Sequence, residues 1–466
     1  MKKGLLAISA LALAFCASAQ TAENDGAEYN QYGQKVESMP AQAKFQDGVL
    51  AFENKDKGFK LWFDTRVQVD CGFFFGGPEW TKEEKVDGKL NGDHIGNGAT
   101  LRRTRFAVKA QLGKNWYGEI DADFSRGTFE LKDAIVGFTG IKGLELRVGN
   151  FKEDFSMNRN GTSRYLMFME RPMATYLAPS RHLGINANYS NPYVWTSVGV
   201  FGPEVKGSDI QTISEDNNKA GMSEGLSYTG KLVLRPFGGK GDLMVHAGAA
   251  ISYREPKTSG EEGYRAQRFS TRNSTSINRK KYVDTDVING VDHELAWTAE
   301  LAALYKGLRF EAAYIKRGVY LDRTVNDKDT QWFDGWYAEA SYLLFGGKQN
   351  YDAGGAKITR IDPGKKWGDL ELALRYQEID LNSKDYYGGA SGMWQVGLNF
   401  YPCRNVKLVA NYGYVNNDRY ANGKGKLNVG LDADGKPTKD YTKIVDPKGK
   451  SGVDYHQLTF RAQIAF

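Results

Sequence analysis

Long runs of alternating apolar and polar residues recur from residue 59 to the end of the chain. In the first run, Phe59, Leu61 and Phe63 fall on one face, and Lys60 and Asp64 fall on the other. This alternation at period two is typical of β-strands, whose successive side chains point to opposite faces. The run is longer than the five or six residues of a typical strand in a soluble protein. It is long enough for a tilted strand to cross a bilayer. The pattern therefore predicts membrane-spanning strands.

Sixteen such runs occur along the chain, and an even number is what a single-chain bacterial barrel requires. We expect strands at about 59–73, 100–112, 116–124, 129–138, 143–151, 183–190, 193–202, 227–236, 242–254, 293–305, 307–319, 334–345, 367–379, 391–402, 405–416 and 454–466. The sequence thus predicts an all-β fold, a sixteen-stranded antiparallel transmembrane β-barrel.

The connections between these strands alternate in length. Short turns at 113–114, 191–192, 306 and 403–404 alternate with long loops at 74–97, 152–182, 203–226, 255–292 and 417–453. Short turns at one end and long loops at the other are typical of outer-membrane barrels. The connection 346–366 is long where a short turn is expected. Either it hides a further hairpin of the barrel, or this turn is elaborated.

The N-terminus carries an export signal. Lys2 and Lys3 precede an apolar stretch, and Ala17-Ser18-Ala19 forms a small-x-small cleavage site, so residues 1–19 are predicted to be a signal peptide. Residues 20–57 are polar and aperiodic, which predicts a flexible periplasmic N-terminal arm. Residues 58–466 are assigned to the barrel. No later segment has the roughly 20 apolar residues of a spanning helix, and the mean hydropathy of -0.53 excludes a helical membrane protein.

The last strand ends in an aromatic residue. His456, Leu458, Phe460, Ile464 and Phe466 share one face, and this amphipathic ending resembles the assembly signal of outer-membrane barrels. As the edge of a soluble sheet, an apolar strand of this length would promote aggregation. The ending therefore favours a barrel over a soluble all-β protein.

The segment from Asn150 to Gly184 is rich in arginine, methionine and aromatic residues. In a soluble domain a loop of this length would argue against the strands that flank it. In a barrel it is expected to fold inward and narrow the lumen. Its methionines are typical of packing against the wall, and Glu170 and Arg171 are candidates for a pair that anchors the loop.

Basic residues with predicted positions in the lumen are the candidate path for anions. Rings of arginine and lysine attract anions, and arginine offers two parallel donors to a phosphate or carboxylate. The candidates are Arg103, Arg105, Lys109, Lys152, Arg159, Arg164, Arg171, Arg181, Lys231 and Arg235. The alternative is that these charges only pair with Glu119, Asp121 and Asp123, which should face the same lumen.

The sequence gives little support for metal binding, catalysis, nucleic-acid binding or a disulfide. The five histidines show no metal-binding spacing, so we expect no metal, no cofactor and no catalytic residues. The formal net charge of +6 is too small to imply a nucleic-acid partner. Cys71 and Cys403 are predicted at opposite ends of the barrel, beyond the ~7 Å reach of a disulfide.

Several stretches, in order from about Leu101 to the C-terminus, resemble the phosphate-selective porin O/P family. They are LRRTRFAVKAQLGKNWYGEIDADF, LKDAIVGF, LELRVGNFKEDFS, LMFMER, SRHLGI, YTGKLVLRP and GDLELALRY. The resemblance implies a sixteen-stranded outer-membrane porin, usually a trimer, with loop 3 folded into the lumen and arginines and lysines leading anions to a constriction. Asp154 stands where the family commonly has proline in Lys-Glu-Pro-Phe-Ser, which adds a negative charge near that constriction.

These observations together predict a passive outer-membrane porin for small hydrophilic solutes. We expect a preference for anions, with phosphate and polyphosphate as candidate solutes. The expected partners are outer-membrane lipid, small anionic solutes and two further copies in a homotrimer. The alternative is a surface receptor or adhesin that binds a partner through its long loops. The loops 255–292 and 417–453, rich in Lys, Arg, Asn and Tyr, would support it.

Overall fold

The structure is a computed structural model of the 466-residue chain. It describes residues 28–31, 33, 35–36, 41–46, 49–56, 58–77, 85–86, 89–90, 95–125, 127–202, 204–205, 225–256, 264–277, 280–418, 420–421, 430–445 and 454–466. The predicted signal peptide lies outside the described residues, and the predicted arm lies partly outside them. Within this described part, no helix combines the length and the apolar character needed to cross a membrane.

The chain divides into two compact units, Met1–Gln42 and Ala43–Phe466. In the first unit, β1 (Glu28–Tyr29) and β2 (Lys35–Val36) form an antiparallel pair. The second unit is a closed barrel.

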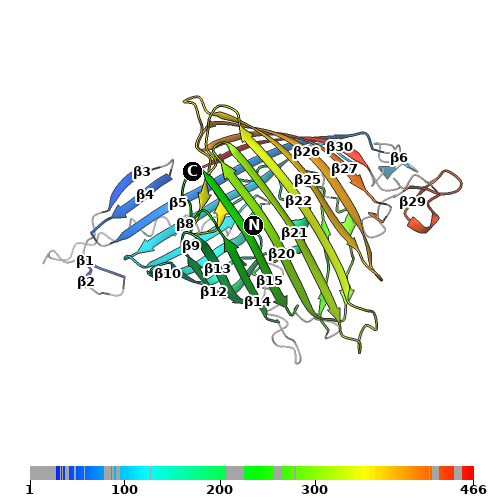
Figure 1. Ribbon diagram of the computed structural model, residues 1–466, viewed down its shortest axis with the longest axis horizontal. Helices are drawn as coiled ribbons and strands as arrows, with labels where there is room; N and C mark the ends of the chain where they lie inside the picture. Colours follow the sequence, from blue (N-terminus) through cyan, green and yellow to red (C-terminus); the bar gives the residue numbers. More distant parts are fainter. Residues whose placement is uncertain are drawn as a thin grey trace. The chain divides into compact units, whose positions relative to one another are not determined.

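Sixteen antiparallel strands make up the barrel wall, as predicted (Figure 1). They are β5 (Phe59–Phe75), β8 (Gly98–Leu112), β9 (Trp116–Asp123), β10 (Glu130–Ile141), β11 (Leu144–Lys152), β12 (Arg181–Ser190), β13 (Val194–Phe201), β14 (Ser227–Leu234), β15 (Leu243–Arg254), β20 (Val291–Tyr305), β21 (Leu308–Leu321), β22 (Gln331–Leu343), β25 (Asp369–Asn382), β26 (Tyr387–Cys403), β27 (Val406–Asn417) and β30 (Tyr455–Ala465). Each strand pairs with the next in this order, and β30 pairs with β5 to close the barrel.

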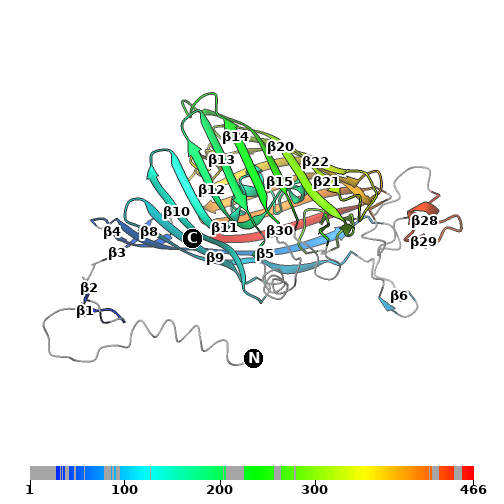
Figure 2. The same ribbon diagram turned by 90° about the horizontal axis from the view of Figure 1, so that it is seen from below.

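The two ends of the barrel differ. We call the end with short connections the turn end, which faces the periplasm in outer-membrane barrels, and the opposite end the loop end. The short strands β28 (Gly430–Leu431) and β29 (Pro437–Thr438) lie at the loop end. Figure 2 shows them at the opposite end of the barrel from β4 (Val49–Asn54).

Strand β4 belongs to the segment that the sequence predicts to be an aperiodic arm. It pairs with the start of β5, from Ala51 opposite Trp62 to Asn54 opposite Phe59, and with β3 (Gln42–Gln46). Strand β30 pairs with β5 only from Arg66 onward. The free edge of β5 below that point offers backbone partners to β4, which explains why this segment becomes extended here.

The barrel wall is apolar outside and polar inside. On β25, Leu372 and Leu374 are each 50% exposed, whereas Glu371 and Arg375, on the opposite face, are 1% and 0% exposed. The aromatic residues Trp116, Trp297, Trp336, Tyr376 and Trp394 lie on the outer face, and neighbours pack together, with the Tyr376 and Trp394 rings 4.7 Å apart. This arrangement suits a lipid-facing surface with interfacial aromatic residues.

The apolar core lies inside the lumen toward the loop end. Two loops enter the barrel there, loop 3 (residues 153–180) and the described part of loop 5 (residues 255–256, 264–277 and 280–290). Loop 3 contains the short helices α2 (Met157–Asn160) and η2 (Met173–Leu177). Loop 5 contains the pairs of β16 (Ala266–Gln267) with β19 (Ile288–Asn289) and of β17 (Ser270–Thr271) with β18 (Val283–Asp284). Their buried apolar residues pack against the inward face of β20–β22 and β25–β27.

The inward course of loop 5 was not predicted. Its described residues hold hydrogen bonds deep in the barrel: Asn273 donates to Ser391 at 2.7 Å, and Gln377 donates to Ser274 at 2.7 Å. The surface-receptor alternative relied on this loop and on 417–453 as outward binding surfaces, and the described part of loop 5 instead packs inside the lumen.

The long connection 346–366 is an elaborated turn, which resolves the alternative left open by the sequence. Strands β23 (Tyr351–Asp352) and β24 (Lys357–Ile358) pair with each other and not with the wall. We call residues 351–358 the inner hairpin, because its side chains pack against inward residues such as Trp195 and Val233.

Candidate functional site

A cavity of about 800 Å³ occupies the part of the lumen that the two loops leave open. Strands β5 and β8–β13 form its outer wall, and loop 3 and the inner hairpin also line it. Nine basic and seven acidic side chains face it, a small excess of positive charge. They are Arg66, Arg105, Lys109, Lys142, Arg147, Lys152, Arg164, Arg181 and Lys357, and Asp64, Glu119, Asp121, Asp133, Glu145, Asp154 and Asp352.

Basic residues of the wall hold loop 3 by its backbone. Five of them donate to loop carbonyl groups: Arg309 to Tyr165 at 3.0 Å, Lys407 to Leu166 at 2.7 Å, Arg461 to Met169 at 2.6 Å, Arg375 to Glu170 at 3.0 Å and Arg317 to Leu177 at 2.9 Å. Because a buried carbonyl group without a partner is costly, these contacts allow an irregular loop to lie inside the barrel. None of the five was predicted, since the sequence gives no measure of loop contacts.

Glu170 is the charged anchor of loop 3. Its carboxylate binds Arg102 at 2.5 and 2.8 Å and lies 3.6 Å from Arg103 and 3.3 Å from Arg461. Burial alone would raise the pKa of Glu170, but Arg102 and Arg103 outweigh it and hold this pKa well below its ordinary value. Arg171, proposed as the partner of Glu170, instead donates to the carbonyl of Asn158 at 3.0 Å within the loop.

Five of the ten predicted anion-path residues line the cavity, and each has a partner. Lys109 lies 3.4 Å from Asp64 and 3.1 Å from Glu119. The remaining contacts are Arg105 with Asp121 at 3.5 Å and Asp123 at 3.2 Å, Arg181 with Asp133 at 2.9 and 2.8 Å, Arg164 with Asp64, and Lys152 with the carbonyls of Asn160 at 3.2 Å and Gly161 at 2.9 Å. The pairing with wall acids that the sequence left as an alternative is therefore present.

The other five predicted residues do not line the cavity. Arg103 donates to Gln68 at 2.7 Å, Lys231 pairs with buried Glu300, and Arg159 lies 6.0 Å from the Tyr176 ring. Arg171 binds loop 3 as described above. Arg235 donates to backbone carbonyls at the turn end, including that of Val194 at 3.2 Å. These side chains stabilise the interior of the barrel.

Arg66 and Arg147 line the cavity but were not among the predicted residues. Arg66 donates to Ser163 of loop 3, and Arg147 pairs with Asp154 and donates to Asn186 at 2.9 Å. The alternation of β5 already placed Arg66 on the inward face, so this signal was available in the sequence.

Three carboxylates in the cavity lie close enough to share a metal ion. Ligand atoms of Glu119, Asp121 and Asp133 lie within 4.8 Å of one another. Each carboxylate also faces a cation, Lys109, Arg105 or Arg181. Because these cations compensate the acidic charge, we describe the cluster as an ion-pair network.

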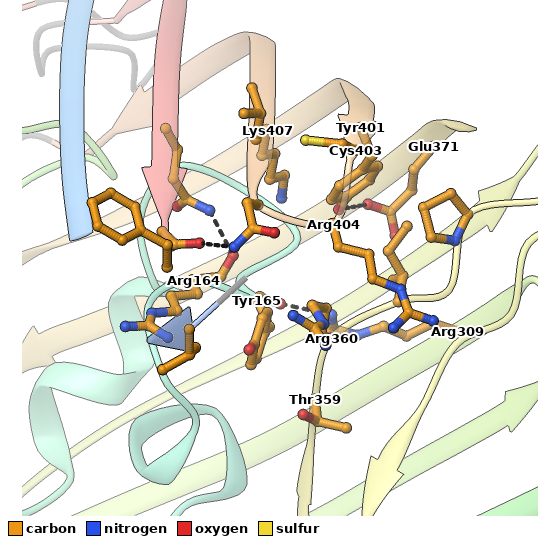
Figure 3. Close-up of a pocket in the computed structure, with 18 residues that line it drawn as sticks. Arg164, Tyr165, Arg309, Thr359, Arg360, Glu371, Tyr401, Cys403, Arg404 and Lys407 are labelled. Carbon is orange, nitrogen blue, oxygen red and sulfur yellow. Dashed lines mark hydrogen bonds between the residues drawn. The ribbon is translucent and has the colours of Figure 1, made fainter. Parts of the chain in front are cut away.

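A smaller cavity of about 50 Å³ lies at the turn end (Figure 3). Arg164 and Tyr165 of loop 3 line both cavities and separate them. Arg309, Arg360, Arg404 and Lys407 also line the smaller one. Its carboxylate, Glu371, accepts hydrogen bonds from Ser341, Asn399 and Tyr401 at 2.6, 2.8 and 2.7 Å.

Comparison with known proteins gives consistent results. The family model described as "Phosphate-selective porin O and P" matches residues 84–435. Porin O of Pseudomonas aeruginosa is 23% identical over 459 residues, covering 91% of this chain and 96% of that protein. An uncharacterized protein of Caulobacter vibrioides is 27% identical over 392 residues, covering 81% of this chain and 72% of that protein.

A solved structure shares the fold. The trimer form of OmpT, an outer membrane protein of Vibrio cholerae, superposes with a TM-score of 0.50 at 12% sequence identity. The match covers 88% of this chain and 100% of OmpT.

Proposed function

The chain belongs to the phosphate-selective porin O and P family, and we propose that it conducts small anions in preference to cations. Family and fold together support the function of an outer-membrane porin. The observation that carries the anion preference is the excess of basic over acidic side chains, nine against seven, around the open cavity. Passage is passive and requires no cofactor.

The pairing of these charges supports a modest preference over a tight phosphate site. A phosphate-binding site would present several donors without other partners, whereas Arg105, Lys109 and Arg181 each have a carboxylate partner. A mixed field of this kind still enriches the ion that matches its net sign. Phosphate and polyphosphate are then two of several anions that pass.

Asp154, the departure from the family motif, adds little free negative charge to the cavity. It pairs with Arg147 and accepts hydrogen bonds from Asn160 at 2.8 Å and Ser197 at 3.1 Å. This compensation is why we retain anion preference in the proposal despite the extra acid.

Planar-bilayer recording across a potassium chloride gradient tests the proposal. The expected reversal potential has the sign of chloride permeation, and added phosphate should carry current. A reversal potential of the opposite sign would overturn the anion preference, and the absence of any channel would overturn the porin function itself.

We also propose that the protein works as a homotrimer in outer-membrane lipid. The support is the half-exposed apolar wall and the fold shared with a protein solved as a trimer. Native mass spectrometry of detergent-purified protein should give three copies, and a monomer at all detergent concentrations would contradict this assembly.

A further inference from the structure

We propose that the open cavity binds zwitterionic solutes of the α-amino-acid class, which carry an ammonium and a carboxylate group on one carbon. The ammonium group binds among three wall carboxylates, and the carboxylate group binds the basic side chains beside them. The inference deepens the proposed porin function and rests on it, because a solute must first enter the lumen.

Two neighbouring strands separate their cavity charges by sign. The charged residues of β8 that line the cavity are Arg105 and Lys109, both basic. Those of β9 are Glu119 and Asp121, both acidic. Lys109 lies directly opposite Glu119 across the strand pair. This part of the wall therefore presents bases on one strand and acids on the next, an arrangement that suits a solute with one charge of each sign.

The acidic trio, Glu119, Asp121 and Asp133, has the spacing that an ammonium group requires. Asp121 and Asp133 are cross-strand partners on β9 and β10, so their side chains lie on the same face. Ligand atoms of the trio lie within 4.8 Å of one another. An ammonium group has three donors, and acceptors about 2.8 Å from its nitrogen in tetrahedral directions are roughly 4.6 Å apart. The trio can therefore accept all three hydrogen bonds.

Asp121 has acceptor capacity that its neighbours do not use. The residue is 6% exposed, and its Oδ1 accepts no hydrogen bond from the described part of the chain. Its cross-strand partner on β8 is Ala107, which has no polar side chain, and its Oδ2 lies 3.5 Å from Arg105. Because a buried acceptor without a donor is costly, a bound ammonium group would stabilise this carboxylate.

Basic side chains flank the trio and can bind the carboxylate group of the same solute. Arg105 lies 3.5 Å from Asp121, Lys109 lies 3.1 Å from Glu119, and Arg181 lies 2.8 Å from Asp133. The Lys109 and Glu119 side chains are 24% and 20% exposed, so they are accessible from the cavity.

The short separation of opposite charges selects among solutes. An α-amino acid carries its two charges at a similar separation and can lie antiparallel to a wall ion pair, with each charge beside its opposite. A simple anion gains the base but is repelled by the acid, and a simple cation or metal ion meets the reverse. The paired wall therefore favours a zwitterion over an uncharged solute of the same size.

Uptake of dilute radiolabelled solutes into liposomes that contain the full-length protein tests the inference. Glycine is the zwitterion, and glycolamide is its uncharged isomer. Glycinamide keeps only the ammonium group, and glycolate keeps only the carboxylate group. At pH 7 we expect glycine to enter about threefold faster than glycolamide, the size of two partly exposed charge contacts. Glycinamide should lack this advantage.

Two variants and a matched control locate the effect. Asp121→Asn and Glu119→Gln each remove one acceptor charge from the trio, and Asp352→Asn removes one acidic charge from the same cavity outside the trio. All three variants change the net charge of the cavity equally. We expect the ratio of glycine to glycolamide uptake to fall toward one in the first two variants and to stay about threefold in the control.

Equal uptake of glycine and glycolamide by the wild-type protein would overturn the inference. An advantage of glycinamide equal to that of glycine would also overturn it, because the trio would then be a cation site only. An equal loss in all three variants would assign the effect to net charge and exclude a zwitterion site. If Asp121→Asn fails to fold, as judged by its heat-dependent mobility on a gel, Glu119→Gln still decides.

Glycolate uptake separates this inference from the proposed function. Entry of glycolate without any advantage for glycine overturns the zwitterion site and leaves the anion channel in place. A protein that admits none of the four solutes overturns the porin function itself.

Discussion

Inward basic side chains fall into two groups according to their partners. Arg375 and Arg461 are 0% and 4% exposed, and each binds both a carboxylate and a carbonyl of loop 3. Arg105 and Lys109 face the open cavity beside acids. The first group stabilises the fold, whereas the second contributes to the electric field that a solute meets.

Arg375→Met should destabilise the barrel strongly. Arg375 Nε donates to the buried carboxylate of Glu339 at 2.7 Å. The substitution removes this guanidinium, so the negative charge of Glu339 keeps less positive charge beside it. Breaking a buried pair in this way costs about 3–5 kcal/mol of unfolding free energy. Arg404→Met is the control, since its pair with Asp362 has both side chains 48% exposed and should contribute about 0–1 kcal/mol. Urea unfolding of both variants measures the difference, and equal losses would contradict the assignment.

Asp121→Asn should raise anion selectivity. The change removes one acidic charge from the cavity and leaves Arg105 with only Asp123 as a partner. We expect the anion-to-cation permeability ratio to rise about twofold in dilute salt and less in concentrated salt. Asp434→Asn, at an exposed residue of the loop end outside the cavity lining, should not change the ratio. A fall in the ratio for Asp121→Asn would contradict the proposed field.

Alternation in the sequence revealed the direction of a side chain but not its partner. It placed Asp64 and Arg66 on one inward face of β5, as the structure has them. It could not pair Arg461 with Asp70, which are 391 residues apart and meet only because β30 closes on β5. The direction of a side chain is enough to predict that it points into the lumen. It does not predict whether loop 3 or the inner hairpin covers that side chain, because this depends on contacts distant in sequence. Only five of the ten predicted residues therefore line the cavity.

Among the structural elements, strands were predictable and inward segments were not. A strand repeats its pattern every two residues, so each of the sixteen was located within a few residues of its ends. Loop 5 has no such repeat, and its Asn273 gave no sign of the buried contacts with Ser391 and Tyr455. The exceptional length of the connection 346–366 was visible, but its inward packing on Trp195 was not.

The anchor of loop 3 should weaken in acid. Because the folded pKa of Glu170 is held below its unfolded value of about 4.3, the carboxylate contributes stability above that pH. This contribution is lost as the pH falls further toward the folded pKa. At pH 7, Glu170→Gln should therefore be less stable than wild type by roughly 3–5 kcal/mol. The difference should shrink between pH 4 and pH 3.

Urea unfolding at several pH values measures this difference. Asp327→Asn is the control, because Asp327 is exposed and its replacement should leave the unfolding free energy nearly unchanged at both pH values. The assignment of Glu170 as a charged anchor fails if the difference between wild type and Glu170→Gln is the same at pH 3 and pH 7.

For the whole molecule, closure of the barrel depends on the meeting of its first and last strands. Phe466, the last residue, exchanges two backbone hydrogen bonds with Thr65, at 2.6 and 3.1 Å. Deletion of Phe466 removes both and exposes the end of the seam. We expect a smaller folded fraction in the outer membrane, measured by heat-dependent gel mobility. Phe466→Tyr keeps the backbone contacts and the aromatic ring and should fold normally. Equal folding of the deletion variant would contradict this role.

Strand β4 also limits where the seam can form. It occupies the edge of β5 from Phe59 to Trp62, and β30 pairs with the same edge from Arg66 upward. A slip of β30 by one residue would turn every inward side chain toward lipid, and a slip toward the turn end would meet β4. Strand β4 therefore excludes β30 from this part of the β5 edge, so a segment that precedes the barrel in the sequence limits where the last strand can pair.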